Sequence, residues 1–227
     1  MTPSAPQPVL LAWSGGKDSA LALAALQADP QYEVVALLTT FSEEAQQTQM
    51  HRVPAALLQA QADALGLPLH AVHVPLDPAN TIYETRMQAA LEHFQSQGVN
   101  ACAFGDLFLE DIRAYRERNL ARIGMQAVFP LWELDTPALA RRFVDQGFKA
   151  IIVSVDTSQL SESFVGRYYD AAFLDALPPG VDPCGENGEF HSFVFDGPIF
   201  RQPVAFTPGE RSAQGNFCWF GIQPPGG

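Results

Sequence analysis

Residues 13–19 read WSGGKDS and bring two glycines, a lysine, an aspartate and two serines into one short segment. The apolar run at residues 9–13 follows Pro8 and predicts a buried strand, while residues 19–27 are rich in Ala and Leu and predict a helix. A glycine turn between a strand and a helix directs backbone N–H groups and the positive end of the helix dipole at its ligand. The segment is therefore predicted to hold a phosphate group, to which Lys17 would add an ammonium.

The segment differs from the two best-known nucleotide-binding loops. Lys17 follows two adjacent glycines and precedes Asp18, so the order G-x-x-x-x-G-K-[ST] is not met, and neither is G-x-G-x-x-G. Lysine is scarce in this chain, because Lys149 is the second one and the other eleven basic residues are arginines. A lysine inside the glycine turn is therefore mildly informative, with chance as the alternative.

A second segment rich in chemically active side chains lies at residues 181–200 and reads VDPCGENGEFHSFVFDGPIF. Its prolines and glycines predict a turn, and residues 190–195 alternate as a strand does. No Lys or Arg interrupts the carboxylates between residues 168 and 200, which are Asp170, Asp175, Asp182, Glu186, Glu189 and Asp196. Crowded carboxylates attract a cation, so this turn is predicted to bind Mg²⁺, ammonium or a cationic substrate, with an exposed acidic loop as the alternative.

Apolar runs alternate with helical patterns along the chain, which indicates an α/β fold with a parallel sheet. Strands are predicted at residues 9–13, 33–40, 69–74, 101–104 and 126–129, and helices at residues 19–27, 54–65 and 82–97 and within 105–124. A change of composition at residues 130–137 precedes a further helix and strand and a C-terminus rich in Pro and Gly. We therefore expect one domain over residues 1–132 and a smaller α+β subdomain over residues 133–227.

Ligands of open α/β sheets bind outside the carboxyl ends of the strands. Thr39, Gly105 and Asp106 stand at such ends and are predicted to face the bound ligand, although Thr39 and its neighbour Thr40 are also ordinary β-branched strand residues. Four arginines between residues 113 and 122 are interleaved with acidic residues. That mixture is more typical of a solvated, salt-bridged face than of a phosphate clamp.

Two motifs resemble known families. The loop is similar to the S-G-G-x-D-S signature of the PP-loop ATP pyrophosphatases, matched at Ser14, Gly15, Gly16, Asp18 and Ser19. The run PCGENGEFHS at residues 183–192, followed by DGP at residues 196–198, resembles the hallmark of the diphthine–ammonia ligase family within that superfamily. The resemblance implies a Rossmann-like, five-stranded parallel sheet flanked by helices, of the PP-loop type, with ATP as the bound nucleotide.

The resemblance also implies an AMP-forming ligase. A substrate carboxylate, on protein-borne diphthine or on a small molecule, would attack the α-phosphorus of ATP, and ammonia would then displace AMP. The loop and Lys17 would hold the departing pyrophosphate, with Mg²⁺ held through Asp18. Candidates to bind and deprotonate ammonium lie in the second motif and are Glu186, Glu189 and His191, and Asn187 of the same motif is counted with them as a catalytic residue.

Three further residues leave alternatives open. His191 is about as readily an ordinary strand residue, and His51, in the loop after the second strand, has weaker support as a functional residue. Cys184 could act as a nucleophile, but a buried structural thiol is preferred because no C-x-x-C spacing accompanies it. The other functions kept open are a different PP-loop chemistry, such as modification of tRNA or of a small molecule, and a non-catalytic sensor of adenine nucleotides.

Composition limits the class of protein. With 227 residues, of which 47% are hydrophobic and 17% charged, the chain can bury one large or two small cores. No apolar run approaches the ~18 residues that a membrane span needs, and the N-terminus lacks a basic leader, so a cytoplasmic protein without membrane partners is expected. A net charge of −12 disfavours a nucleic-acid partner, and three scattered cysteines disfavour a disulfide framework. A homo-oligomer is compatible with this composition.

Overall fold

The computed structural model describes residues 5–48, 50–76 and 79–226, and its N-terminal part forms the predicted parallel sheet. The strands lie in the order β3-β2-β1-β4-β5 and every neighbouring pair is parallel. They are β1 (Gln7–Ala12), β2 (Tyr32–Ser42), β3 (Leu69–Val74), β4 (Ala101–Ala103) and β5 (Gln126–Val128). The order reverses beside β1, so the glycine loop that follows β1 lies where ligands of such sheets bind. The predicted fold class is confirmed.

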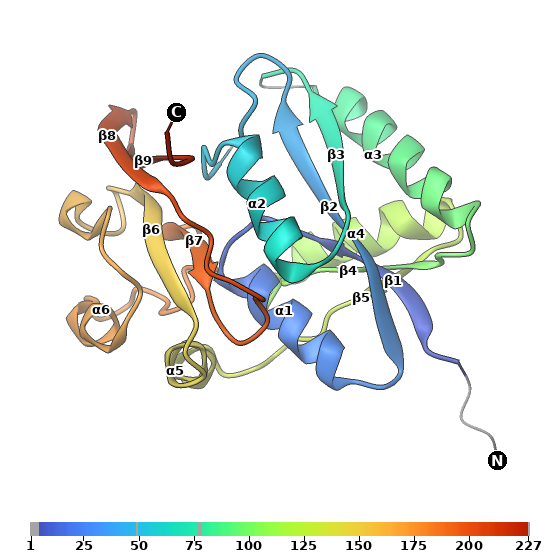
Figure 1. Ribbon diagram of the computed structural model, residues 1–227, viewed down its shortest axis with the longest axis horizontal. Helices are drawn as coiled ribbons and strands as arrows, with labels where there is room; N and C mark the ends of the chain where they lie inside the picture. The colour runs from blue at the N-terminus through green and yellow to red at the C-terminus, as the bar shows by residue number, and fades with distance from the viewer. Residues whose placement is uncertain (1–4, 49, 77–78, 227) are drawn as a thin grey trace.

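Helices cover both faces of this sheet (Figure 1). They are α1 (Lys17–Ala28), α2 (Ala55–Leu65), α3 (Asn80–Gln95) and α4 (Glu110–Arg122). Successive residues of a strand point to opposite faces, so Leu11 packs in the core with α1 and α2, whereas Leu10 packs with α3 and α4. Helix α2 is capped by Gly66, whose φ of 71° is the left-handed conformation that glycine adopts readily.

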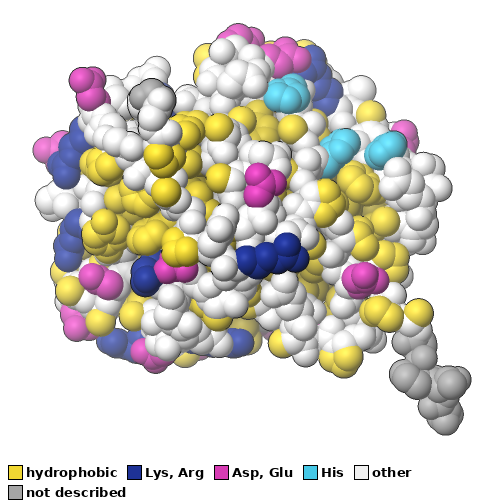
Figure 2. Space-filling model, in the orientation of Figure 1, with side chains coloured by type: hydrophobic (Ala, Val, Ile, Leu, Met, Phe, Trp, Pro, Cys, Tyr) yellow, Lys and Arg dark blue, Asp and Glu magenta, His cyan; other side chains and the backbone are white. Residues whose placement is uncertain are grey.

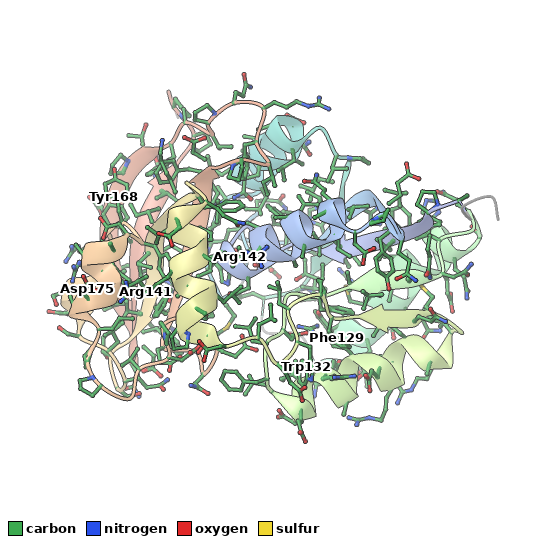
Figure 3. The ribbon with its side chains drawn as sticks, turned by 90° about the horizontal axis from the view of Figure 1, so that it is seen from below. Phe129, Trp132, Arg141, Arg142, Tyr168 and Asp175 are labelled. Carbon is green, nitrogen blue, oxygen red and sulfur yellow. The ribbon has the colours of Figure 1, made fainter. Side chains whose placement is uncertain are left out.

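The C-terminal part forms a second, antiparallel sheet in the order β7-β6-β9-β8. Its elements are α5 (Thr136–Asp145), β6 (Lys149–Asp156), the 3-10 helix η1 (Glu162–Phe164), α6 (Ala171–Ala176), β7 (Phe190–Asp196), β8 (Thr207–Gln214) and β9 (Phe217–Gln223). Figure 3 shows Arg141 of α5 near Asp175 of α6, and the two side chains form an ion pair at 3.3 Å. The hairpin of β8 and β9 was not predicted from the sequence.

The two sheets lie on opposite sides of α1 and α2 (Figures 1 and 3), and one hydrophobic core includes residues of both sheets. Backbone hydrogen bonds join the two parts of the chain. Val194 of β7 donates its N–H to the carbonyl of Gly15 at 2.9 Å, and Arg201 donates to the carbonyl of Ala64 at 2.8 Å. The second motif therefore packs directly against the glycine loop. The predicted boundary between residues 132 and 133 lies between β5 and α5 and stays a prediction.

The surface has mixed character. In Figure 2, hydrophobic side chains gather on the left of the face, over the second sheet, and Lys and Arg are scattered across it. Tyr168 of this part of the chain is 58% exposed, and its ring lies 5.9 Å from that of Phe195. None of the helices in the described residues is long and apolar enough to cross a membrane. The predicted homo-oligomer stays a prediction.

Candidate functional site

The glycine loop is held in shape by its own polar groups. Gly16 caps α1 and donates its N–H to Ser14 Oγ at 3.2 Å, and Ser19 Oγ donates to the Gly16 carbonyl at 2.8 Å. Gly15 has a φ of 79°, and a Cβ added there would lie 2.7 Å from Gln61 Oε1. Position 15 therefore needs glycine both for its left-handed backbone and for space.

Two residues far along the chain brace this loop. Gln61, on α2, is fully buried. Its side-chain N–H groups donate to the carbonyls of Gly15 and Val194 at 3.0 and 2.6 Å. Its side-chain oxygen accepts from the indole N–H of Trp13 at 2.8 Å. Ser192 Oγ accepts from the backbone N–H of Lys17 at 3.1 Å, although 175 residues separate the two. The sequence motif therefore depends on a buried glutamine and on β7 for its geometry.

Lys17 and Asp18 form an ion pair at the start of α1. The Lys17 ammonium is 4% exposed and lies 2.8 Å from the Asp18 carboxylate, which is 28% exposed. Burial alone would lower the pKa of Lys17, but the neighbouring Asp18 charge raises it above its ordinary value, so the ammonium is charged. A fixed positive charge thus stands at the helix N-terminus, where phosphate oxygens bind.

A cleft of about 420 Å³ opens beside the loop, at the carboxyl ends of β1, β2 and β4; we call it the large cleft. Its volume lies within the range of small-molecule sites. Seven of the predicted site residues line it, and these are Ser14, Asp18, Ser19, Thr39, Gly105, Asp106 and Glu186. The structure therefore brings residues of both motifs to one cleft.

Two residues of the large cleft have structural partners. The Thr39 hydroxyl donates to the carbonyl of Trp13 at 2.6 Å, which ties β2 to the start of the loop. Asp106 pairs with Arg116 of α4 through two hydrogen bonds of 2.5 and 3.1 Å. The prediction of a salt-bridged face holds for Arg113, which pairs with Glu117 at 2.8 Å, but Arg116 lines the cleft.

Gly105 lies against the backbone of the loop as well as at the cleft. A Cβ at this position would approach the carbonyl carbon of Asp18 to 2.9 Å. Because backbone atoms cannot move away cheaply, Gly105→Ala is expected to lower the free energy of unfolding by about 1–3 kcal/mol, measured by urea denaturation. An unchanged urea midpoint would show that the backbone after β4 can move away from α1 without loss of stability.

A smaller cavity of about 130 Å³ adjoins the large cleft, between the loop and the second motif; we call it the loop cavity. Side chains that line it include Lys17, His51, Glu186 and His191. Glu186 lines both this cavity and the large cleft. Its Oε1 accepts from the backbone N–H of Leu107 at 2.7 Å, and burial raises its pKa to about 7.

Glu189 and Asn187 of the second motif support the turn. Glu189 is 2% exposed, and its Oε1 accepts from the backbone N–H of Asp182 at 2.9 Å and from the Asn187 amide at 3.0 Å. The residues that line the two cavities include Glu186 but neither Asn187 nor Glu189. In this geometry Glu189 and Asn187 shape the turn that presents Glu186. Their predicted contact with ammonium stays a prediction.

Two histidines stack in the loop cavity. The rings of His51 and His191 have centroids 4.4 Å apart and planes 24° apart. Burial lowers the pKa of His191 to about 4, with the Lys17 charge adding to the effect. The pKa of His51 lies well below its ordinary value, mainly because the ring is buried and further because His191 and Lys17 disfavour a second positive charge beside them. Both imidazoles are therefore neutral at neutral pH.

The segment that carries His51 is held by the second sheet. The guanidinium of Arg52 lies 3.4 Å from the ring centroid of Trp219, whose indole N–H donates to the Met50 carbonyl at 3.1 Å. Arg52 has a φ of 51°, which is uncommon for a residue other than glycine and is retained only where neighbours enforce it. The C-terminal hairpin thus fixes the position of His51.

Trp219→Phe tests this attachment because phenylalanine keeps a ring under Arg52 but removes the indole donor. The free energy of unfolding is expected to fall by about 1 kcal/mol, and amide exchange at residues 50–53 to increase. Trp132→Phe is a matched control, since the guanidinium of Arg113 lies 4.6 Å from its ring centroid and its indole donates no hydrogen bond within the described chain. Equal losses in both variants would mean that the indole hydrogen bond adds nothing.

Cys184 is buried, as preferred from the sequence. Its thiol is 1% exposed and donates to the carbonyl of Thr136 at 3.5 Å. Burial raises the pKa of Cys184 to about 12, and the same is true of Cys102. Neither thiol is a ready nucleophile at neutral pH.

Comparisons with known proteins match both parts of the chain. Residues 8–127 match the diphthamide synthase N-terminal domain, and residues 135–223 match the diphthamide synthase C-terminal domain. The chain is 26% identical over 219 residues to the diphthine–ammonia ligase of Danio rerio, which covers 87% of this chain and 85% of that protein. It is 24% identical over 231 residues to the enzyme of that name from Mus musculus, covering 87% and 82%. For the Schizosaccharomyces pombe protein of that name, 24% identity extends over 65% of this chain and 25% of the relative.

Proposed function

The chain belongs to the diphthamide synthase family, and from this premise we propose that it is an ATP-dependent ligase that forms an amide from a carboxylate and ammonia. The relatives named above are diphthine–ammonia ligases, which supports this class of reaction. The proposed substrate is a carboxylate, carried on diphthine or on a small molecule. ATP activates it by transfer of AMP, with release of pyrophosphate.

One observation carries the proposal: Glu186 of the second motif lines both the large cleft and the loop cavity. A group that handles the second substrate must reach the atoms that the nucleotide activates, because reacting atoms have to come within ~3–3.5 Å of each other. Glu186 lies at the junction where this is feasible. A protein that merely binds nucleotide has no use for an acidic group there.

The loop serves the first step. The substrate carboxylate attacks the α-phosphorus, the bond to the bridging oxygen breaks, and the negative charge that develops on the pyrophosphate is stabilised by Lys17 and the first turn of α1. Mg²⁺ usually takes one or two carboxylates and completes its shell with phosphate oxygens and water. Asp18 fits this role, and no group of three or more His, Cys, Asp or Glu within the described residues could hold a metal by itself. When bound, Mg²⁺ would neutralise phosphate charge.

Glu186 serves the second step. With a pKa near 7, its carboxylate is about half ionised at neutral pH and can take a proton from ammonium. The ammonia that results attacks the acyl carbon, and AMP leaves with the electron pair of the acyl–phosphate bond. The carboxylate is held toward the site by its hydrogen bond from Leu107.

The two alternative functions fit less well. Sulfur transfer to tRNA would require an accessible thiolate, whereas Cys102, Cys184 and Cys218 are all buried, and burial raises the pKa of the first two to about 12. A non-catalytic sensor would require the loop alone and would leave Glu186 without a purpose. The product of ATP turnover decides among the three functions.

The deciding experiment supplies the protein with ATP, Mg²⁺, ammonium and a panel of carboxylates that includes diphthine-bearing protein. Carboxylate-dependent formation of AMP and pyrophosphate is expected, together with one amide for each AMP. Formation of ADP and phosphate would contradict the proposal. A reaction without carboxylate serves as the control for simple hydrolysis.

A further inference from the structure

The stacked histidines leave ring nitrogens without partners in the loop cavity. Among the described residues, buried side-chain atoms without a hydrogen-bond partner include His51 Nδ1 and His191 Nε2. Buried polar groups in proteins are nearly always paired, so an unpaired one marks a place where a water, ion or ligand group is missing. Two such nitrogens on rings 4.4 Å apart indicate one shared ligand.

The surroundings of the cavity identify the charge of that ligand. The Lys17 ammonium and the N-terminus of α1 face the cavity, and the Asp18 carboxylate is already paired with Lys17. Burial is the main cause of the lowered pKa of both histidines, and the Lys17 charge adds to it in both, so Lys17 lies close enough to act on both rings. An anion gains from Lys17 in such a position, whereas ammonium can reach Glu186 from the large cleft, which Glu186 also lines.

The loop residues that line the cavity indicate which kind of anion it binds. Ser14, Gly16 and Lys17 line it together with the histidines. These loop residues are of the types that cradle phosphate oxygens. The volume of about 130 Å³ is too small for a nucleoside but suits part of a phosphate chain.

We infer that His51 and His191 bind the terminal phosphates of ATP and the pyrophosphate that leaves, each donating a ring N–H to a phosphate oxygen. The inference rests on the proposed function only in that a phosphate chain enters the loop. It departs from the ammonium role predicted for His191 and gives His51 a role that its sequence position alone did not support. The Arg52–Trp219 contact then positions a ligand-binding residue.

The experiment measures binding of sodium pyrophosphate and of AMP by calorimetry, without turnover. His51→Gln and His191→Gln are each expected to weaken pyrophosphate binding roughly tenfold, because a hydrogen bond to a charged group is lost. AMP binding should change less than about twofold, since AMP lacks the terminal phosphates. His70→Gln is the matched control, because His70 belongs to another stacked histidine pair, with His93, and does not line the loop cavity.

A second measurement needs no variant and so does not depend on their folding. In the wild-type protein, the ¹⁵N signals of His51 and His191 should shift when pyrophosphate is added and stay in place when ammonium chloride is added. Unchanged pyrophosphate affinity in both variants, or signals that respond to ammonium and not to pyrophosphate, would overturn the inference. The two proposals can fail separately. If the variants lose pyrophosphate binding but the wild-type protein makes no AMP, the histidine inference stands and the proposed function fails.

Discussion

Glu186→Gln is expected to reduce amide formation at least about 100-fold, because a general base is lost. Nucleotide affinity should stay within about threefold of wild type, because no contact to the phosphates is removed. Glutamine keeps an oxygen that can accept the Leu107 N–H, so the turn should retain its shape. Measured kcat for amide formation and Kd for ATP separate the two effects. Glu110→Gln, an exposed residue at the start of α4, is the matched control.

The pH profile sharpens this prediction. The active form of Glu186 is the carboxylate, so the rate should show an inflection near pH 7, the raised pKa of this group, and this inflection should vanish in the glutamine variant, whose rate should follow the concentration of free ammonia. Burial is the main cause of this raised pKa, the hydrogen bond from Leu107 and the Lys17 charge lower it, and the Asp18 and Asp106 charges raise it. A full rate in the variant, or an unaltered profile, would contradict the role of Glu186 as base.

Stability gives an independent control on the same variant. The folded pKa of about 7 lies above the ordinary value of 4.5, so the folded protein binds a proton that the unfolded chain has released between these values. Stability from this group is therefore lost as pH rises from 4.5 through 7. Glu186→Gln should consequently be at least as stable as wild type at pH 8, and a loss of activity there would not come from unfolding.

Asp18→Asn is expected to have the second large effect, a fall in AMP formation of roughly 100-fold with a higher Mg²⁺ requirement. Asparagine removes the negative charge proposed to hold the metal, and it also removes the partner of the buried Lys17 ammonium. The variant should therefore lose stability as well, since a buried charge without its partner is costly.

Two measurements distinguish these consequences. A titration with Mg²⁺ at fixed ATP reports the metal requirement, and urea denaturation reports the ion pair. Asp145→Asn, an exposed residue at the end of α5, should change neither. If Asp18→Asn kept its Mg²⁺ requirement and lost only stability, Asp18 would serve the ion pair and not the metal.

The parallel sheet was predictable because its strands are continuous apolar runs separated by helical patterns. The β8–β9 hairpin was not, because β8 reads TPGERSAQ and is exposed along nearly its whole length. Alternation between buried and exposed residues is the signal that marks a strand in a sequence, and β8 has none. Its pairing with β9 comes from tertiary contacts.

The same contrast holds for the candidate site. The glycine loop and the second motif were found because their residues are contiguous in the sequence. Gln61 was missed because it acts through Val194, 133 residues away, and Arg116 was assigned to a solvated face because its partner Asp106 lies outside helix α4. Their partners become visible once the fold brings them together. His51 gained its importance in the same way, through its stacking on His191.

Attack of the substrate carboxylate on the α-phosphorus of ATP would leave a trace in the oxygen atoms of the products. The protein is supplied with ATP, Mg²⁺, ammonium and a carboxylate labelled with ¹⁸O in both oxygens, and the products are analysed by mass spectrometry. We expect one ¹⁸O atom in each AMP and one in each amide. Label in inorganic phosphate, or AMP that carries no ¹⁸O while amide is formed, would contradict this mechanism.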